Sequence, residues 1–524
     1  MSKKRGAFVA ATLCAALVAS TLAVGSQTSA APPPCDKQVN NTINKLLECV
    51  TLEGTREHQA ALQAIADANG GTRVSGSPGY DESVDYAVEV FEAAGLDVTV
   101  QPFQFQTFIT LSPPVLEQVS PGPVGPVENA ILSYAGSGDI TASVTALPAP
   151  PVDLTPGCQA ADFAGFPAGN IALISRGSCT FAIKATNAYN AGASAVIIYN
   201  NAAGPINGTL GNDFTLNVAV TSVTQAVGLQ LAATPGLVMR LAADTFRGIA
   251  TTYNVLAETP GGNADNVVMV GAHLDSVNAG PGINDNGSGT AAILEVAQQM
   301  QKVPVKNKVR FALWGAEESG LVGSNYYVAN LPADELADIA LYLNFDMIGS
   351  PNHVFFIYDG DDSDATGAGA GPAGSAQIEK TFERYFTQRD IPFKGTDFSG
   401  RSDYQAFILN NIPAGGLFTG AEGVKTPAEA ATWGGTAGVA YDPCYHLACD
   451  TYANNNNEAL AVNTDAVAYA TLTYALNTRD INDAKARAVP GSTTPPALRT
   501  AGSPQPSDGS QGGLHDHDHD KVAA

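Results

Sequence analysis

Short, continuous apolar runs alternate with amphipathic patterns through the second half of the chain. The runs at 267–272, 309–314 and 340–345 are typical of strands buried on both faces of a parallel sheet. Between and after them, stretches such as 290–302 and 376–390 repeat apolar residues three and four positions apart, which is typical of helices. This alternation predicts an α/β fold: a mixed, largely parallel twisted sheet with helices on both faces.

The first part of this α/β domain precedes a long insertion. Helical periodicity fills residues 37–94, and alternating apolar and polar residues at 97–108 predict a strand at the edge of a sheet. From Ser112 the chain becomes rich in proline, which indicates a crossing between domains. We therefore assign the α/β domain to residues 31–115 and 251–480.

Two further segments differ from the α/β domain in composition. Residues 116–250 are poor in charge and carry short apolar runs, such as 171–177 and 193–201, which predict a compact, β-rich inserted domain. Residues 481–524 are rich in Pro, Ser, Thr and Gly and lack the apolar content to fold, so we expect a disordered tail.

The first 30 residues have the pattern of a secretory signal peptide. A basic start at Lys3, Lys4 and Arg5 precedes an apolar stretch at 7–24, and small residues lead to a cleavage signal at 28–30. An uncleaved anchor is the alternative, because the apolar stretch is just long enough to span a bilayer. The many Ala, Ser and Thr residues favour cleavage and a secreted, extracellular protein.

The length and charge of the chain limit its class. With 524 residues it exceeds one ordinary domain. Its 26 basic and 50 acidic residues give a formal net charge of −24, which argues against nucleic acid or an anionic membrane as a partner. We expect no membrane association after the signal is removed.

The cysteines indicate an oxidising compartment. Of seven, Cys14 lies in the signal peptide, which leaves an even number for a disulfide framework. Proximity along the chain suggests the pairs Cys35–Cys49, Cys158–Cys179 and Cys444–Cys449, one of about 15 pairings that six cysteines allow. No CxxC pair is present, so a thiolate zinc site is not expected.

Acidic residues and a histidine follow three consecutive strands of the predicted sheet. The first strand leads to His273, Asp275 and Asp285, the second to the adjacent Glu317 and Glu318, and the third to Asp346. One acidic residue at a strand end is more often a helix cap or a solvated charge. Three such strand ends meet at one edge of a parallel sheet, where open α/β folds bind their ligands.

These residue types are ligands of zinc and similar divalent ions, and one more histidine would complete a site for two metals. His446 supplies it, in a short loop between Cys444 and Cys449. The two neighbouring glutamates point in different directions if the chain is extended there, so that one can bind metal while the other faces a water molecule. Asp275 has the spacing of a carboxylate that orients the imidazole of His273.

Two resemblances extend this interpretation. The segment CQAADFAGFPAGNIALISRGSCTFAIKATNAYNAGASAVIIYNN resembles the protease-associated domain of secreted peptidases. That resemblance implies a lid or a protein-contact role without catalytic residues, and an inert spacer that aids folding is an equal alternative. The motifs AHLDS, NDNGSG, WGAEESGLVGS, NFDMIGS, GRSDYQAF and CYHLACD resemble those of the double-zinc aminopeptidases, close to the secreted bacterial leucine aminopeptidases, over residues 57–108 and 253–476.

The second resemblance implies the zinc exopeptidase fold and a role for each candidate residue. Asp285 would bridge two Zn²⁺ ions, one also bound by His273 and Asp346. Glu318 and His446 would bind the other ion. The remaining implied roles are a general base for Glu317, a hydrogen bond from Tyr445 to the oxyanion, and a cis peptide bond between Asp285 and Asn286.

The same resemblance implies a substrate site. Arg401 would lie near the substrate N-terminus, while Met347 and Phe418 would line the side-chain pocket. An ion pair of Arg401 with Asp403 or Asp397, and core packing of Phe418, are the structural alternatives.

The combined features predict a secreted zinc metallo-aminopeptidase that hydrolyses the N-terminal bond of peptides and proteins, preferring apolar residues such as Leu. Its partners would be substrates with free N-termini, and we expect a monomer. A carboxypeptidase or dipeptidase of the same superfamily is the nearest alternative, followed by a receptor-like protein without catalysis. Calcium binding stays open, without a motif that supports it.

Overall fold

The computed structural model describes residues 35–487 except 203, 205, 207, 366 and 368. The predicted signal peptide and residues 488–524 of the predicted tail lie outside this part of the chain. The chain divides into two compact units, Met1–Gln38 and Val39–Ala524. In the first, the structure describes one short 3-10 helix, η1 (Cys35–Lys37). Apart from the oxidation state of Cys35, all that follows concerns the second unit.

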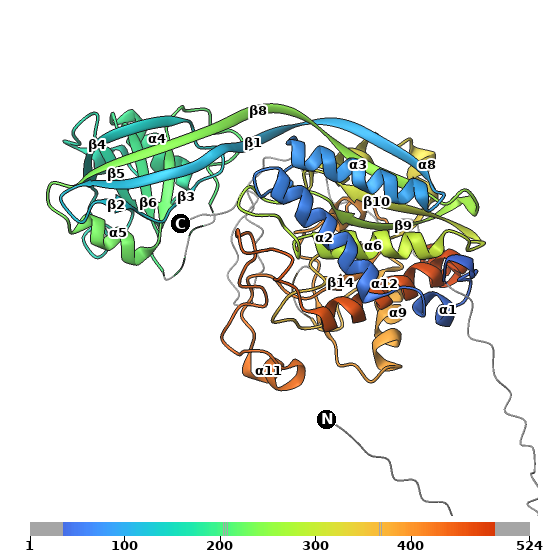
Figure 1. Cartoon of the computed structure of the whole chain (residues 1–524). Helices are drawn as coiled ribbons and strands as arrows, with labels where there is room; N and C mark the ends of the chain where they lie inside the picture. The colour runs from blue at the N-terminus through green and yellow to red at the C-terminus, as the bar shows by residue number, and fades with distance from the viewer. Residues whose placement is uncertain are drawn as a thin grey trace, which may run out of the picture. The chain divides into compact units, whose positions relative to one another are not determined.

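The α/β domain is built on strands from the second half of the chain, with one long strand from each side of the insertion (Figure 1). They are β1 (Asp97–Ser120), β8 (Val238–Glu258), β9 (Asn263–His273), β10 (Asn307–Trp314), β11 (Ile339–Phe345), β12 (Phe356–Tyr358), β13 (Lys394–Thr396) and β14 (Ala414–Phe418). The order of this part is β13-β12-β14-β11-β9-β10-β8, with β1 paired to β8. β9 is parallel to both β10 and β11, while β8 and β12 run antiparallel to their neighbours β10 and β14. The predicted mixed sheet is confirmed.

Helices cover both faces of this sheet, as predicted. One face carries α1 (Ile43–Leu47), α2 (Leu52–Ala68), α3 (Pro78–Ala93), α6 (Gly287–Met300), α9 (Ser375–Thr387) and α12 (Asn457–Leu476). The other carries α7 (Val322–Asn330), α8 (Ala333–Asp338) and α10 (Tyr404–Ile408). Successive strand residues alternate between the two cores, since Val268 and Val270 of β9 pack on the first and Val267 and Met269 on the second. A strand buried on both faces explains its continuous apolar sequence.

β1 and β8 form a long antiparallel pair that connects the α/β domain with the insertion (Figure 1). The pairing runs from Asp97↔Glu258 to Ser120↔Val238, with register shifts on both sides of Ser112. Proline has no backbone N–H for a sheet, so Pro113 and Pro114 lie where such an irregularity is tolerated. The crossing that the sequence indicates from Ser112 is therefore made by paired strands.

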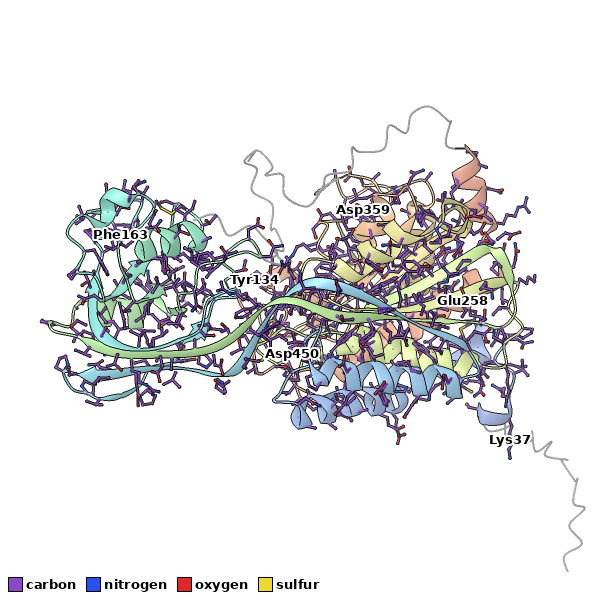
Figure 2. All side chains as sticks on the ribbon, turned by 90° about the horizontal axis from the view of Figure 1, so that it is seen from above. Lys37, Tyr134, Phe163, Glu258, Asp359 and Asp450 are labelled. Carbon is purple, nitrogen blue, oxygen red and sulfur yellow. A yellow bond between two sulfur atoms is a disulfide. The ribbon has the colours of Figure 1, made fainter. Side chains whose placement is uncertain are left out.

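The inserted domain carries its own two apolar cores on opposite faces of its strands. Its elements are β2 (Gly125–Pro126), β3 (Ala130–Ile131), β4 (Gly138–Ala146), η2 (Ala160–Phe163), β5 (Ile171–Ser175), α4 (Phe181–Asn190), β6 (Ala195–Tyr199), β7 (Val220–Val223) and α5 (Gln225–Ala232). Phe163 packs in one of these cores (Figure 2). β4, β5, β6 and β7 are parallel, and β4 joins β8, so the sheet continues into this domain.

The C-terminal boundary predicted from the sequence is wrong. α13 (Arg479–Arg487) occupies the start of the segment 481–524, for which the composition predicts no structure. Ile481 is fully buried in the main core, and Lys485 Nζ donates to Ile339 O at 3.1 Å. Asn482 Nδ2 also donates to Asn266 Oδ1 at 3.1 Å. One buried side chain and these two tertiary hydrogen bonds hold a polar helix that the local composition does not favour. Earlier in the chain, between β14 and α12, α11 (Pro427–Trp433) begins with the capping pair Thr426 and Glu429.

Disulfides confirm two of the predicted pairs, Cys158–Cys179 and Cys444–Cys449. Cys35 and Cys49 are also disulfide-bonded. Such bonds are typical of oxidising compartments outside the cytoplasm. Among the described residues, no helix combines the length and the apolar character that a membrane crossing needs.

Candidate metal centre

The end of β9 and the start of α6 hold the first part of the site. His273 is the last residue of β9, and Asp285 directly precedes Asn286, the residue that caps α6. Asn286 Oδ1 accepts from Gly289 N at 3.0 Å, and its Nδ2 donates to Phe345 O of β11 at 2.9 Å. Capping thus fixes Asp285 between two strands. The peptide bond between Asp285 and Asn286 is cis, as expected.

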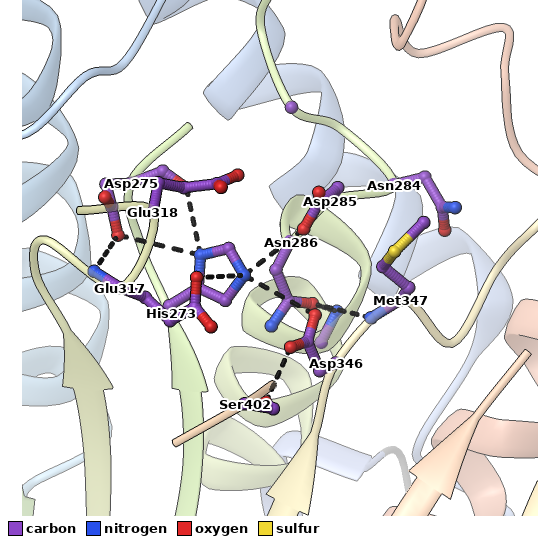
Figure 3. Close-up of polar contacts among 12 residues, drawn as sticks. His273, Asp275, Asn284, Asp285, Asn286, Glu317, Glu318, Asp346, Met347 and Ser402 are labelled. Atoms are coloured by element: carbon purple, nitrogen blue, oxygen red, sulfur yellow. Dashed lines mark hydrogen bonds and ion pairs between the residues drawn. The ribbon is translucent and has the colours of Figure 1, made fainter. Parts of the chain in front are cut away.

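Asp285 faces two histidines with its two carboxylate oxygens. Its Oδ1 lies 3.2 Å from His273 Nε2, and its Oδ2 lies 3.2 Å from His446 Nε2 (Figure 3 shows the His273 side). His273 Nε2 is also 3.4 Å from Asp346 Oδ1, and His446 Nε2 is 3.1 Å from Glu318 Oε2. The structure therefore brings the five predicted ligands into two groups that share one carboxylate.

The two other predicted carboxylates lie beside His273. Glu317 Oε2 is 3.9 Å from His273 Nε2 and is fully buried. The other ring nitrogen, Nδ1, lies 3.1 Å from the backbone oxygen of Asp275 and 3.6 Å from its Oδ1. Asp275 Oδ1 in turn accepts from Glu317 N at 3.2 Å, so one carboxylate touches both neighbours (Figure 3). This is the arrangement that fixes the orientation of a metal-binding imidazole.

Several polar atoms at the centre are buried without a partner in hydrogen-bonding geometry among the described residues. They are His273 Nε2, both carboxylate oxygens of Asp285 and of Glu317, and Asp346 Oδ1. Buried polar atoms are normally paired, so such a convergent set is unusual. The spacing of His273, Glu317 and Asp346, and of His273, Asp285 and Glu318, would allow each group to hold a metal ion.

The electrostatics of the site favour bound cations. Burial alone would lower the pKa of His273, but the carboxylates of Glu317 and Asp346 raise it well above its ordinary value. Burial would also lower the pKa of His446, but the carboxylates of Glu318 and Asp285 outweigh burial and raise this pKa to about 10. In the absence of metal the carboxylates thus draw protons onto both imidazoles. Zinc, which takes nitrogen and carboxylate oxygen ligands, fits the donor set and would supply positive charge in place of these protons.

Three residues that the sequence did not single out support this centre. Ser402 Oγ donates to Asp346 Oδ2 at 2.6 Å (Figure 3). Asp450 Oδ1 and Oδ2 accept from the backbone N–H groups of Asn284 and Asp285 at 2.9 and 3.0 Å. Both residues lie in motifs that the resemblance rests on, GRSDYQAF and CYHLACD, which is the signal that could have found them.

Arg73 is the third supporting residue, and it carries no motif. Its guanidinium is fully buried and donates to the backbone oxygens of Leu274, Pro281 and Gly282, at 3.0 Å for Pro281 and 2.8 Å for Gly282. Burial lowers its pKa to about 10, so it remains a cation at neutral pH. One side chain therefore ties together both ends of the loop between His273 and Asp285.

A pocket adjoins the centre on the side of Asp346. Arg401 and Phe418, two of the three residues predicted to contact the substrate, line it together with Tyr358 and Ser399. Met347, the third, is fully buried and is not among the residues that line the pocket. It follows the predicted ligand Asp346, and its N–H donates to Asn286 Oδ1 at 3.2 Å.

The partners of Arg401 differ from the structural alternatives considered for it. Its Nη1 pairs with Glu422 Oε1 at 3.0 Å, rather than with Asp403 or Asp397, and its Nη2 lies 3.3 Å from the hydroxyl of Tyr445. Tyr445 precedes His446, and their rings stack at 3.9 Å. Arg401 and Tyr445 thus place a cation and a hydroxyl beside the metal centre.

One more acidic group, Asp359, Asp361 and Glu379, lies on a different segment. Asp359 accepts from Ser363 N and Asp364 N at 3.0 and 2.8 Å, and Glu379 accepts from Gly360 N at 3.0 Å. These carboxylates cap a loop, so we assign no metal to them.

Similarity to known proteins agrees with this site. The model of peptidase family M28 matches residues 254–471, and that of the PA domain matches 140–231. An aminopeptidase of Pseudomonas aeruginosa (strain UCBPP-PA14) is 48% identical over 454 residues, which is 84% of this chain and 83% of that protein. A probable leucine aminopeptidase 2 of Aspergillus oryzae is 44% identical over 431 residues, 81% of this chain and 84% of its own.

Solved structures share the fold. The aminopeptidase from Aneurinibacillus sp. strain AM-1 matches with a TM-score of 0.58 and 28% identity, over 82% of this chain and 95% of its own. A zinc aminopeptidase from Bacillus subtilis matches with a TM-score of 0.61 and 26% identity, over 80% of this chain and 94% of its own.

A buried cluster of histidines and carboxylates at the carboxyl edge of an α/β sheet defines a metal-dependent hydrolase. The matches make the class specific: the chain belongs to peptidase family M28, is a zinc aminopeptidase, and carries an inserted PA domain. The predictions of family, fold and enzyme class are confirmed.

Proposed function

We propose that this aminopeptidase removes N-terminal residues from peptides and proteins, with a preference for apolar residues such as Leu, by means of two zinc ions. His273 and Asp346 would hold one ion, Glu318 and His446 the other, and Asp285 would bridge them. The observation that carries this proposal is the position of Asp285, whose two oxygens each lie 3.2 Å from a different histidine.

Bound there, zinc would lower the pKa of a coordinated water and polarise the scissile carbonyl. The chain supplies the proton transfers. Glu317 is positioned beside His273, and burial, with the nearby carboxylates of Asp403 and Asp346, raises its pKa well above the usual range, although His273 opposes this. A carboxylate with a raised pKa accepts the proton of the attacking water and returns it to the leaving amine.

Tyr445 and Arg401 would act on the substrate. The Tyr445 hydroxyl donates to the oxygen that becomes negative during attack, and the Arg401 guanidinium, 3.3 Å away, favours that charge. The free amine of the substrate would lie against Glu317 and Asp346. Phe418 supplies an apolar wall for the side chain, which supports a preference for apolar residues.

Location and assembly follow from the same features. We propose that residues 1–30 direct the chain out of the cell and are then removed, which agrees with its disulfides. A relative in Mycobacterium tuberculosis, 45% identical, is named a probable lipoprotein aminopeptidase, so we expect this chain too to work outside the cytoplasm. We expect a monomer.

A panel of aminoacyl-p-nitroanilides tests the activity. We expect Leu-p-nitroanilide to be cleaved fastest, its N-acetylated form to resist cleavage, and a chelator to abolish activity until zinc is restored. Because a carboxypeptidase or dipeptidase needs a free carboxylate instead, cleavage of acetyl-Leu peptides from the C-terminus would contradict the proposal. Full activity after zinc removal would contradict it as well.

A further inference from the structure

Asn278 lies in the loop between the ligands His273 and Asp285 and makes two hydrogen bonds to the long strand β1. Its Nδ2 donates to Phe108 O at 3.0 Å, and its Oδ1 accepts from Thr110 N at 3.4 Å. A side-chain amide that pairs with both a carbonyl and an N–H of one strand acts as a local extension of the sheet. This loop is therefore attached to β1 immediately before the register shift at Ser112.

The residue opposite Phe108 in β8 is attached to the inserted domain. Phe108 pairs with Arg247, whose Nη1 donates to the backbone oxygens of Tyr134, Phe214 and Leu216 at 3.0, 2.9 and 3.1 Å. The Tyr134 ring packs on Phe108 with centroids 5.8 Å apart, near the point where the insertion meets β1 and β8 (Figure 2). The paired residues Phe108 and Arg247 thus connect two parts of the protein. Arg247 contacts the inserted domain, and Phe108 contacts Asn278 in the loop between His273 and Asp285, here called the metal loop.

The loop transmits its position to both halves of the centre. Its ends carry His273 and Asp285, and its middle packs against the loop of His446. At Gly280 an added Cβ would lie 2.4 Å from Leu447 O and 3.0 Å from Ala448 Cα, so the two loops touch through backbone. A displacement of Asn278 would therefore change the distances among His273, Asp285 and His446.

We propose that Asn278 is a positioning residue that couples the inserted domain to the metal centre. The inserted domain, held by Arg247, fixes the β1–β8 pair at Phe108, and Asn278 uses that fixed strand to set the geometry of the metal loop. The inference rests on the proposed ligand roles of His273 and Asp285. By this inference the inserted domain has a function in the reaction, although the inserted domain contributes no group to the site.

A double-mutant cycle tests this coupling in the full-length protein. The variants are Asn278→Ala, Arg247→Met and their combination. Arg240→Met is the control, because Arg240 lies on the same strand as Arg247, β8, but makes exposed ion pairs with Asp139 of β4 and Glu117 of β1. We measure kcat and KM for Leu-p-nitroanilide, and hydrogen–deuterium exchange of residues 274–282 with and without zinc. The exchange measurement does not depend on turnover, so it separates this inference from the proposed activity.

We expect each single variant to lower kcat by about 10-fold to 100-fold with little change in KM, because small displacements of reacting groups have effects of that order. Each should speed exchange in 274–282, and the double variant should be no worse than the single variants, because both remove the same connection. Arg240→Met should match the wild type.

Effects on kcat that multiply in the double variant would overturn the proposal, as would an Arg247→Met variant whose exchange changes only within the inserted domain. If Arg247→Met fails to fold, Arg247→Lys replaces it and is judged by the same criteria. Lysine keeps the charge but lacks the planar guanidinium that donates to the three backbone oxygens.

Discussion

Replacing Arg73 with Met should weaken the metal centre without touching a metal ligand. Methionine replaces the aliphatic part of the arginine side chain but has none of the donors that the guanidinium directs at the loop. The backbone oxygens of Leu274, Pro281 and Gly282 would lose their partner in a fully buried position. The cation that lies near the carboxylates of Asp275 and Asp285 would be lost as well.

The magnitude follows from these contacts. A buried acceptor that loses its donor costs about 1–3 kcal/mol, so the loss of all of the donors should lower the free energy of unfolding by about 3–6 kcal/mol after local relaxation. Zinc affinity should fall by about 10-fold to 100-fold, as when other supporting residues of metal sites are removed.

Urea unfolding of the zinc-free protein measures the first quantity, and competition with a chelator measures the second. Arg389→Met is a matched control, because Arg389 donates to the backbone oxygen of Tyr385 at 3.2 Å far from the metal loop. If Arg73→Met binds zinc within twofold of the wild type, the loop does not need this residue and our account of it is refuted.

Three further predictions concern other parts of the site and the core. Asp450→Asn should lower zinc affinity about 10-fold or more, because only one oxygen remains for the N–H groups of Asn284 and Asp285; unchanged competition with a chelator would contradict this. Tyr445→Phe should lower kcat by about 100-fold to 1,000-fold with little change in KM, and an unchanged kcat would exclude its role. Burial raises the pKa of Glu295 from 4.5 to about 7, so the folded state favours the protonated acid. Its stabilisation is therefore complete below about pH 4.5 and should decline by about 3 kcal/mol as pH rises through 7, whereas Glu295→Gln should remove this decline in denaturation measured across pH.

Much of the fold follows from local sequence pattern. Strands such as β9 and β11 are buried on both faces, so their apolar runs are continuous and easily recognised. A candidate ligand lies at the carboxyl end of each, His273 as the last residue of β9 and Asp346 directly after β11, and the carboxyl ends of parallel strands meet at one edge. The positions of these strands along the chain and of the candidate ligands are thus two results of the same pattern.

The supporting contacts could not be predicted in this way. Arg73 acts on backbone carbonyls about 200 positions later in the chain, and such contacts leave no trace in residue type or spacing. The helix α13 depends on Ile481 entering a distant core, which its polar composition does not indicate. Asn278 likewise depends on the path of β1, since prolines in the strand suggest an irregular segment more readily than a paired one.

The central claim is that two zinc ions share Asp285 and that Glu317 serves the reaction without holding them. The most direct test is the zinc content of the purified wild type and of Glu317→Gln, measured by inductively coupled plasma mass spectrometry alongside hydrolysis of Leu-p-nitroanilide. We predict two zinc ions per chain in both proteins and loss of turnover in the variant alone. A single zinc ion in the wild type, or a Glu317→Gln variant that keeps its activity, would contradict the account.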